Sequence, residues 1–159
     1  MAEKLENLKR DYGKLAMKYK LPDYKILNEE FDVEPLAERE TETLLREIRK
    51  IIMDKIIAYL RFTEMLINPS NAPMFFFAIL KGINSDDKKL LEEVYAKLGR
   101  LEVGVIVVDN DYSEQGEADF IKHVFSEWAD IKKNMRIVAK ALQSGWDKKR
   151  EKRDKSYLG

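Results

Sequence analysis

The stretch that most constrains how this chain folds runs from residue 44 to residue 67 and reads LLREIRKIIMDKIIAYLRFTEMLI. Its apolar side chains recur every three or four residues, and from Ile51 onward they cover nearly every side of a helix. A helix with one apolar face packs against a core, and a helix that is apolar on most sides is surrounded by protein. We therefore expect a central helix that begins between Pro35 and Thr41.

Lys55 interrupts the widest apolar arc of this stretch, between Ile48 and Phe62. The favoured interpretation is that its stem packs on the core while its ammonium group reaches solvent. The alternative is a desolvated lysine with a lowered pKa or a buried carboxylate partner, which is typical of functional sites. Glu117 and Glu102 each fall near an apolar stripe and could face it, although a helix-end or rim position is the favoured interpretation of each. These three residues are the candidate catalytic groups.

The same periodicity predicts helices over residues 3–20, 86–110 and from Ser113 to about Trp146, with short helices around Ile26 and Phe76. Asp23 and Ser85 are expected N-caps. Residues 31–35 are expected to be extended, because the residue before a proline is pushed out of the α region. The expected fold class is all-α, an antiparallel helical bundle of four long helices with one or two short extra helices. We expect one domain over residues 1–146 and a charged, flexible tail over 147–159.

Residues 103–109, VGVIVVD, are the one ambiguous segment, since a short β-branched run is also typical of a buried strand. The apolar residues from Leu91 to Tyr112 nevertheless keep helical spacing, and no second strand is apparent to satisfy the backbone of the first. We favour a helix. If the segment is a strand, its partner is the same segment of a second subunit.

The amino-acid composition excludes several classes of function. The 159 residues contain no cysteine, which excludes disulfides, thiolate metal sites and cysteine nucleophiles. Lysine plus arginine equals aspartate plus glutamate, at 29 each, so no net field favours nucleic acid. No apolar signal segment or membrane span is apparent, and we expect a soluble cytoplasmic protein without membrane association. The charge-rich composition is typical of heat-adapted proteins.

Sites for chemistry are few. Asp119, His123 and Glu127 share one helix face and are weak metal-ligand candidates, but a solvated polar face explains them, and we expect no metal and no cofactor. The tail concentrates basic residues, with Trp146 and Tyr157 nearby, yet acidic residues dilute its field, so nucleic-acid binding is not the favoured interpretation. Those basic residues are Lys148, Lys149, Arg150, Lys152, Arg153 and Lys155.

Excess apolar surface gives the leading hypothesis. The segment Met74, Phe75, Phe76 and Phe77, and the pair Val103 and Val107, exceed what a small bundle can cover. We expect a non-enzymatic protein that works by self-association or partner binding, as a homodimer. The competing hypothesis is a small-molecule enzyme or ligand-binding protein with a pocket near Lys55, and the third is a nucleic-acid-associated protein that uses the basic tail.

Overall fold

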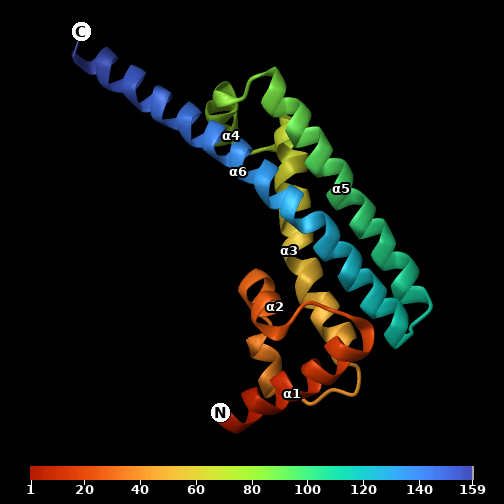
Figure 1. The fold of residues 1–159 in the computed structure, drawn as a ribbon. Helices are drawn as coiled ribbons and strands as arrows, with labels where there is room; N and C mark the ends of the chain where they lie inside the picture. Colours follow the sequence, from red (N-terminus) through yellow and green to blue (C-terminus); the bar gives the residue numbers. More distant parts are fainter. Residues whose placement is uncertain (159) are drawn as a thin grey trace. The chain divides into compact units, whose positions relative to one another are not determined.

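The computed structural model describes residues 1–158, apart from the side chains of Asn71, Lys149, Tyr157 and Leu158. Its long helices are α1 (Ala2–Tyr19), α3 (Leu44–Ile67), α5 (Ser85–Asn110) and α6 (Glu114–Leu158), and its short α-helices are α2 (Tyr24–Phe31) and α4 (Met74–Ile79) (Figure 1). Three short 3₁₀ helices lie between them: η1 (Glu34–Glu38), η2 (Pro69–Asn71) and η3 (Leu80–Gly82). The described residues contain no β-strand. The predicted all-α class, with four long helices and two short ones, is confirmed.

Residues 103–109 lie within α5, so the strand alternative for this segment is wrong. Leu91, Val94, Leu98 and Leu101 are buried along one side of this helix. A helix satisfies its own backbone groups, whereas a lone strand cannot. The N-cap of α5 is Asn84 rather than the predicted Ser85. The side chains of Asn84 and Asp87 each accept a hydrogen bond from the other's backbone N–H, which is a reciprocal capping arrangement.

The region before α3 differs from the prediction. Asp23 caps α2 as expected by accepting from the Ile26 N–H. Residues 31–35 are not extended, however. Asp32 adopts a left-handed conformation that ends α2. Pro35 occupies the first turn of η1, where a backbone N–H would have no helical partner and its absence costs nothing. The central helix consequently begins at Leu44 rather than between Pro35 and Thr41.

The chain forms two compact units. Unit 1 comprises Met1–Ile57 with Arg100–Ser126, and unit 2 comprises Ala58–Gly99 with the residues from Glu127 onward. Helices α3, α5 and α6 contribute one segment to each unit. The buried apolar side chains of unit 1 come from α1, α2, η1, α3, α5 and α6, and include Tyr12, Leu27, Leu36, Leu45, Ile48, Ile52, Ile56, Leu101, Ile121 and Val124.

The core of unit 2 joins α3, α4, α5 and α6 through Leu66, Phe76, Ile79, Leu91, Val138 and Leu142. The backbones of η3 and α6 meet at two glycines: a methyl group on Gly145 would lie 2.6 Å from the Gly82 nitrogen and 2.6 Å from the Ile79 carbonyl oxygen. Such an approach is open only to glycine. Figure 1 shows α4 beside the middle of α6, in keeping with this contact.

Helix α6 continues through the segment predicted as a tail, to Leu158. The described side chains of residues 147–156 are exposed along it. The predicted flexibility of this segment and the predicted domain boundary at residue 146 stay predictions. Among the described helices, none combines the length and apolar character that a membrane crossing requires.

Candidate functional site

Lys55 lies partly buried in the unit 1 part of α3. Its Nζ donates a hydrogen bond to the backbone carbonyl of Glu30 at 2.6 Å and lies 5.5 Å from the ring centre of Phe31. These two residues form the C-terminal end of α2, where carbonyl groups lack helical partners and the helix dipole favours a cation. The geometry gives Lys55 a structural role as a cap for α2.

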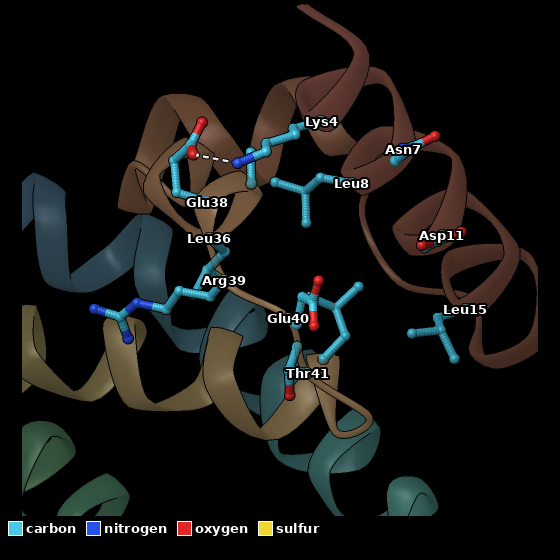
Figure 2. Close-up of a pocket in the computed structure, with 12 residues that line it drawn as sticks. Lys4, Asn7, Leu8, Asp11, Leu15, Leu36, Glu38, Arg39, Glu40 and Thr41 are labelled. Atoms are coloured by element: carbon cyan, nitrogen blue, oxygen red, sulfur yellow. Dashed lines mark hydrogen bonds and ion pairs between the residues drawn. The ribbon is translucent and has the colours of Figure 1, made fainter. Parts of the chain in front are cut away.

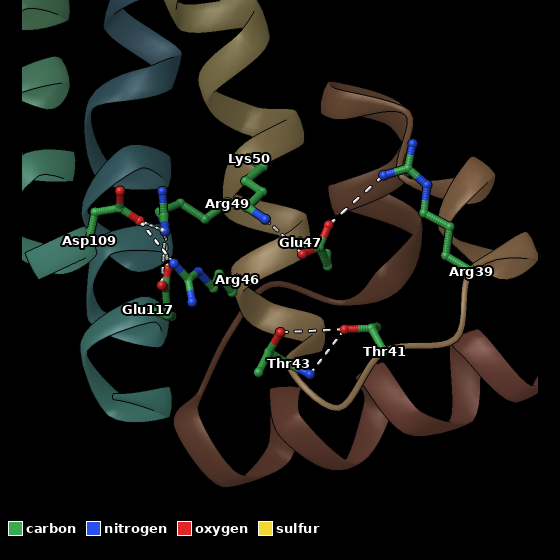
Figure 3. Close-up of polar contacts among 9 residues, drawn as sticks. All are labelled: Arg39, Thr41, Thr43, Arg46, Glu47, Arg49, Lys50, Asp109 and Glu117. Carbon is green, nitrogen blue, oxygen red and sulfur yellow. Dashed lines mark hydrogen bonds and ion pairs between the residues drawn. The ribbon is translucent and has the colours of Figure 1, made fainter. Parts of the chain in front are cut away.

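Glu117 makes its hydrogen bonds with Arg49 rather than with Lys55. Arg49 Nε lies 2.5 Å from one carboxylate oxygen of Glu117, and Arg49 Nη2 lies 3.1 Å from the other. Arg49 is 3% exposed and Glu117 is fully buried, at 0%. Figure 3 shows this forked pair joining α3 to the start of α6, with Asp109 of α5 beside it. A two-point guanidinium–carboxylate contact is the strongest ion-pair geometry available to these groups.

Two further charges complete the cluster. Arg49 Nη2 also donates to Asp109 at 3.0 Å, and Arg46 reaches the same carboxylate oxygen at 3.4 Å. Arg46 in turn lies over the ring of Tyr112, 5.4 Å from its centre. With two guanidinium groups and two carboxylates, the cluster is formally neutral and ties three helices of unit 1 together.

The electrostatics of the cluster favour fixed charges over proton transfer. Burial acts to lower the pKa of Arg49, but the hydrogen bonds and charges of Glu117 and Asp109 outweigh it, so the Arg49 pKa stands above its ordinary value. The hydrogen bond from Arg49 lowers the pKa of Asp109. General acid–base catalysis needs a group whose pKa lies near the working pH, and these shifts move Arg49 and Asp109 away from it.

The sequence interpretation missed Arg49. Its apolar neighbours at helical spacing are Leu45, Ile52 and Met53, the same type of signal that singled out Lys55. Glu117 was noted for the same reason, but no pattern within either helix indicated that they pair. A test of every charged residue against its neighbours three and four positions away would have found Arg49.

The other candidates are distributed along α5 and α6. Glu102 is partly buried on α5, and His123 is exposed on α6. Asp119 accepts from Gln115 and pairs with Lys122, while Glu127 pairs with Lys97. Within the part of the chain that the structure describes, no three His, Cys, Asp or Glu side chains gather as a metal site.

The predicted basic tail lies on the exposed end of α6, where the described side chains of Lys148, Arg150, Lys152, Arg153 and Lys155 are all exposed. Trp146 is also exposed, whereas the side chains of Lys149 and Tyr157 lie outside the described residues. Asp147, Glu151 and Asp154 alternate with the basic residues on this helix. Nucleic-acid binding by this segment stays a prediction.

Unit 1 also contains an open cavity of about 590 Å³ between α1, η1 and the link to α3. Leucines line its floor, and its rim carries charges of both signs; Figure 2 shows Lys4 and Glu38 paired at the rim, 2.8 Å apart. The hydrogen bond between them raises the pKa of Lys4 and lowers that of Glu38. Both partners are more than half exposed, so the pair is weak, and the mixed charges select no particular class of ligand.

The apolar side chains predicted to form an interface divide into buried and exposed ones. Phe76 is buried in the unit 2 core, whereas Met74, Phe75 and Phe77 of α4 are exposed. On α5, Val103 is 62% exposed, Ile106 59% and Val107 67%. The last three residues, all in unit 1, are called here the α5 stripe. Ile106 was not predicted, although its spacing from Val103 places it on the same face.

Comparisons with known proteins add no relative: no family, no curated protein and no solved structure matches the chain.

Proposed function

We propose that this protein works by self-association, as a homodimer in which the α5 stripe of one subunit packs against the α5 stripe of a second. The observation that carries the proposal is the exposure of three neighbouring β-branched residues, Val103, Ile106 and Val107, on one face of a long helix. Large apolar side chains grouped on a surface mark interaction sites, whereas single ones need no explanation.

A second copy is the favoured occupant because the stripe complements itself. In an antiparallel pair of α5 helices centred between Val103 and Val107, each of these valines faces the other in the partner. Such a two-fold arrangement brings the same surface of both subunits together.

The charges beside the stripe support the same arrangement. Arg100 and Asp111 lie beyond opposite ends of the stripe, and both are exposed. Asp111 is the first residue after α5, and its N–H still donates to the Val107 carbonyl, so helical spacing places both charges on the flank that carries Val107. In an antiparallel pair, equal flanks of the two helices meet, so Arg100 of each subunit lies opposite Asp111 of the other. Opposite charges at such positions fix register and orientation more than they add affinity.

The energy indicates a reversible dimer. Complete burial of a valine or isoleucine side chain contributes about 1.5–3 kcal/mol, and the three are roughly 60% exposed. Six side chains then contribute about 6–11 kcal/mol, against an association cost of about 4–15 kcal/mol. The favourable ends of these two ranges leave about 7 kcal/mol, so we expect a weak dimer with a dissociation constant on the order of 10–100 μM.

Sedimentation equilibrium over a concentration series that spans this range tests the proposal. The double variant Val103→Glu/Val107→Glu should stay monomeric throughout, because it places four carboxylates in the interface. Met17→Glu is the matched control, since Met17 is 87% exposed on α1 and lies outside the stripe. A wild-type protein that is monomeric at every concentration, or a dimer that the double variant leaves intact, would refute the proposal.

A charge exchange tests the antiparallel register. Arg100→Glu should weaken the dimer, because it places two carboxylates opposite each other at both ends. Adding Asp111→Arg should restore association by re-forming the pairs with reversed polarity. If the second substitution gives no recovery, the register proposed here is wrong.

A further inference from the structure

Unit 2 carries a groove between α3 and α6 that is separate from the α5 stripe. Its volume is about 450 Å³, and we call it the α3–α6 groove. The residues that line it are Tyr59, Phe62, Lys132, Met135, Arg136 and Ala139. The four from α6 follow helical spacing, so they share one face of that helix opposite the two from α3.

The two aromatic rings that line this groove pack against buried aromatic side chains. The ring of Tyr59 stacks on Trp128, with centres 5.7 Å apart and planes inclined by 22°, and Trp128 is buried. Phe62 contacts Phe76 of the unit 2 core, with ring centres 5.9 Å apart. Rings fixed in this way give a ligand a rigid surface, which reduces the entropy lost on binding.

Both charged residues that line the groove are basic. Lys132 and Arg136 line it, and no aspartate or glutamate is among its lining residues. An arginine beside an apolar wall suits an anionic group, because its guanidinium binds a carboxylate or sulfonate through two parallel hydrogen bonds. The groove therefore combines an apolar surface with a cationic edge.

The size of the groove indicates the class of ligand. Small-molecule sites have volumes of about 300–1,000 Å³ and mainly apolar walls with a few placed polar groups. A stable protein partner needs about 800 Å² of surface on each side, which calls for 20 to 30 residues rather than a groove lined by six.

We propose that the α3–α6 groove binds a small amphipathic anion, such as an aryl or alkyl carboxylate. Its apolar body lies against Tyr59, Phe62 and Met135, and its acidic group lies between Lys132 and Arg136. This inference does not depend on the α5 stripe, since it concerns residues of unit 2 alone.

The test uses a matched pair of fluorescent probes, 8-anilinonaphthalene-1-sulfonate and its uncharged analogue N-phenyl-1-naphthylamine. We expect saturable binding of the sulfonate at one site, and weaker binding of the uncharged probe. Lys132→Gln/Arg136→Gln should weaken sulfonate binding about tenfold or more, because a hydrogen bond to a charged group is lost at each position. The same variant should leave the uncharged probe unaffected.

Two controls accompany this comparison. Lys133→Gln/Lys140→Gln removes the same number of charges from exposed positions of α6 outside the groove and should leave both affinities unchanged. Ala139→Trp fills the groove and should abolish binding of both probes. Circular dichroism and the thermal midpoint show that each variant is folded, so that loss of binding is not loss of structure.

Displacement of the sulfonate by laurate would support the assignment to a small ligand. The proposal is refuted if the two charge variants bind the sulfonate equally well, or if Ala139→Trp, while folded, still binds it. Displacement by an acidic helical peptide but not by laurate would overturn the small-molecule assignment in favour of a protein partner.

Discussion

Removing the two members of the Arg49–Glu117 pair singly and together is the sharpest test of how unit 1 is held together. Arg49→Met leaves Glu117, which is fully buried, without its cation, and breaking a buried pair in this way costs about 3–5 kcal/mol. Glu117→Leu should cost less, because Arg49 keeps Asp109, 3.0 Å away. The double variant should lie within about 1 kcal/mol of the wild type or exceed its stability, since apolar replacements avoid the cost of removing both charges from water.

Urea unfolding followed by circular dichroism gives the free energy of unfolding of each variant and hence the coupling energy between the two sites. The exposed pair Lys4–Glu38 is the matched control in the same unit, because both side chains are more than half exposed. Its cycle should give a much smaller coupling, because water screens the charges of an exposed pair. A coupling at Arg49–Glu117 as small as that of the control would refute the reasoning, because it would mean that water screens the pair.

Three further predictions concern single positions. Gly145→Ala should destabilise the protein and lower its thermal midpoint, because the added methyl group would meet the backbone of Gly82. Gly99→Ala is the control: no atom lies within 4 Å of its added methyl group, so it should stabilise α5 by about 0.5–1 kcal/mol. Burial and, to a lesser degree, the charge of Asp23 raise the pKa of Tyr12 well above its ordinary value of 10.0. The free energy of unfolding should therefore fall above pH 10.0, where the tyrosine ionises in the unfolded chain but not in the folded one. Tyr12→Phe should reduce that fall in unfolding curves measured at alkaline pH. The pKa of Asp109 is lowered from 3.8 in the folded protein, so its ionised form contributes fully to stability above pH 3.8. This contribution is lost as the pH falls from 3.8 through the pKa of the folded protein. Asp109→Asn should therefore reduce the loss of stability at acid pH.

The sequence by itself determined the approximate positions of the long helices, although α6 continues beyond its predicted end at Trp146. Apolar residues at helical spacing located α1, α3, α5 and α6, and the same spacing identified α5 as a helix despite its β-branched run. The cap at Asp23 was also predictable. These features depend on interactions between residues close in sequence, which a one-dimensional pattern contains.

Local preferences failed to predict the structure where tertiary contacts opposed them. The extended connection predicted at residues 31–35 is replaced by the left-handed Asp32 and by η1, and this moves the start of α3 to Leu44. The preference of a residue before proline is weak enough for tertiary contacts to override, and the buried side chains of Val33 and Leu36 supply such contacts here.

Only the tertiary structure decided which charges meet. Lys55 and Arg49 have similar apolar neighbours along α3, yet Arg49 contacts Glu117, 68 residues further along the chain, and Lys55 caps α2. The same holds for the α3–α6 groove, whose walls come from distant parts of the sequence, and for Phe76, which is buried while Phe75 and Phe77 are exposed. Helical periodicity gives the direction of a side chain relative to its own helix. Its partner depends on how the helices cross and rotate against one another, and that is determined by packing across the whole unit.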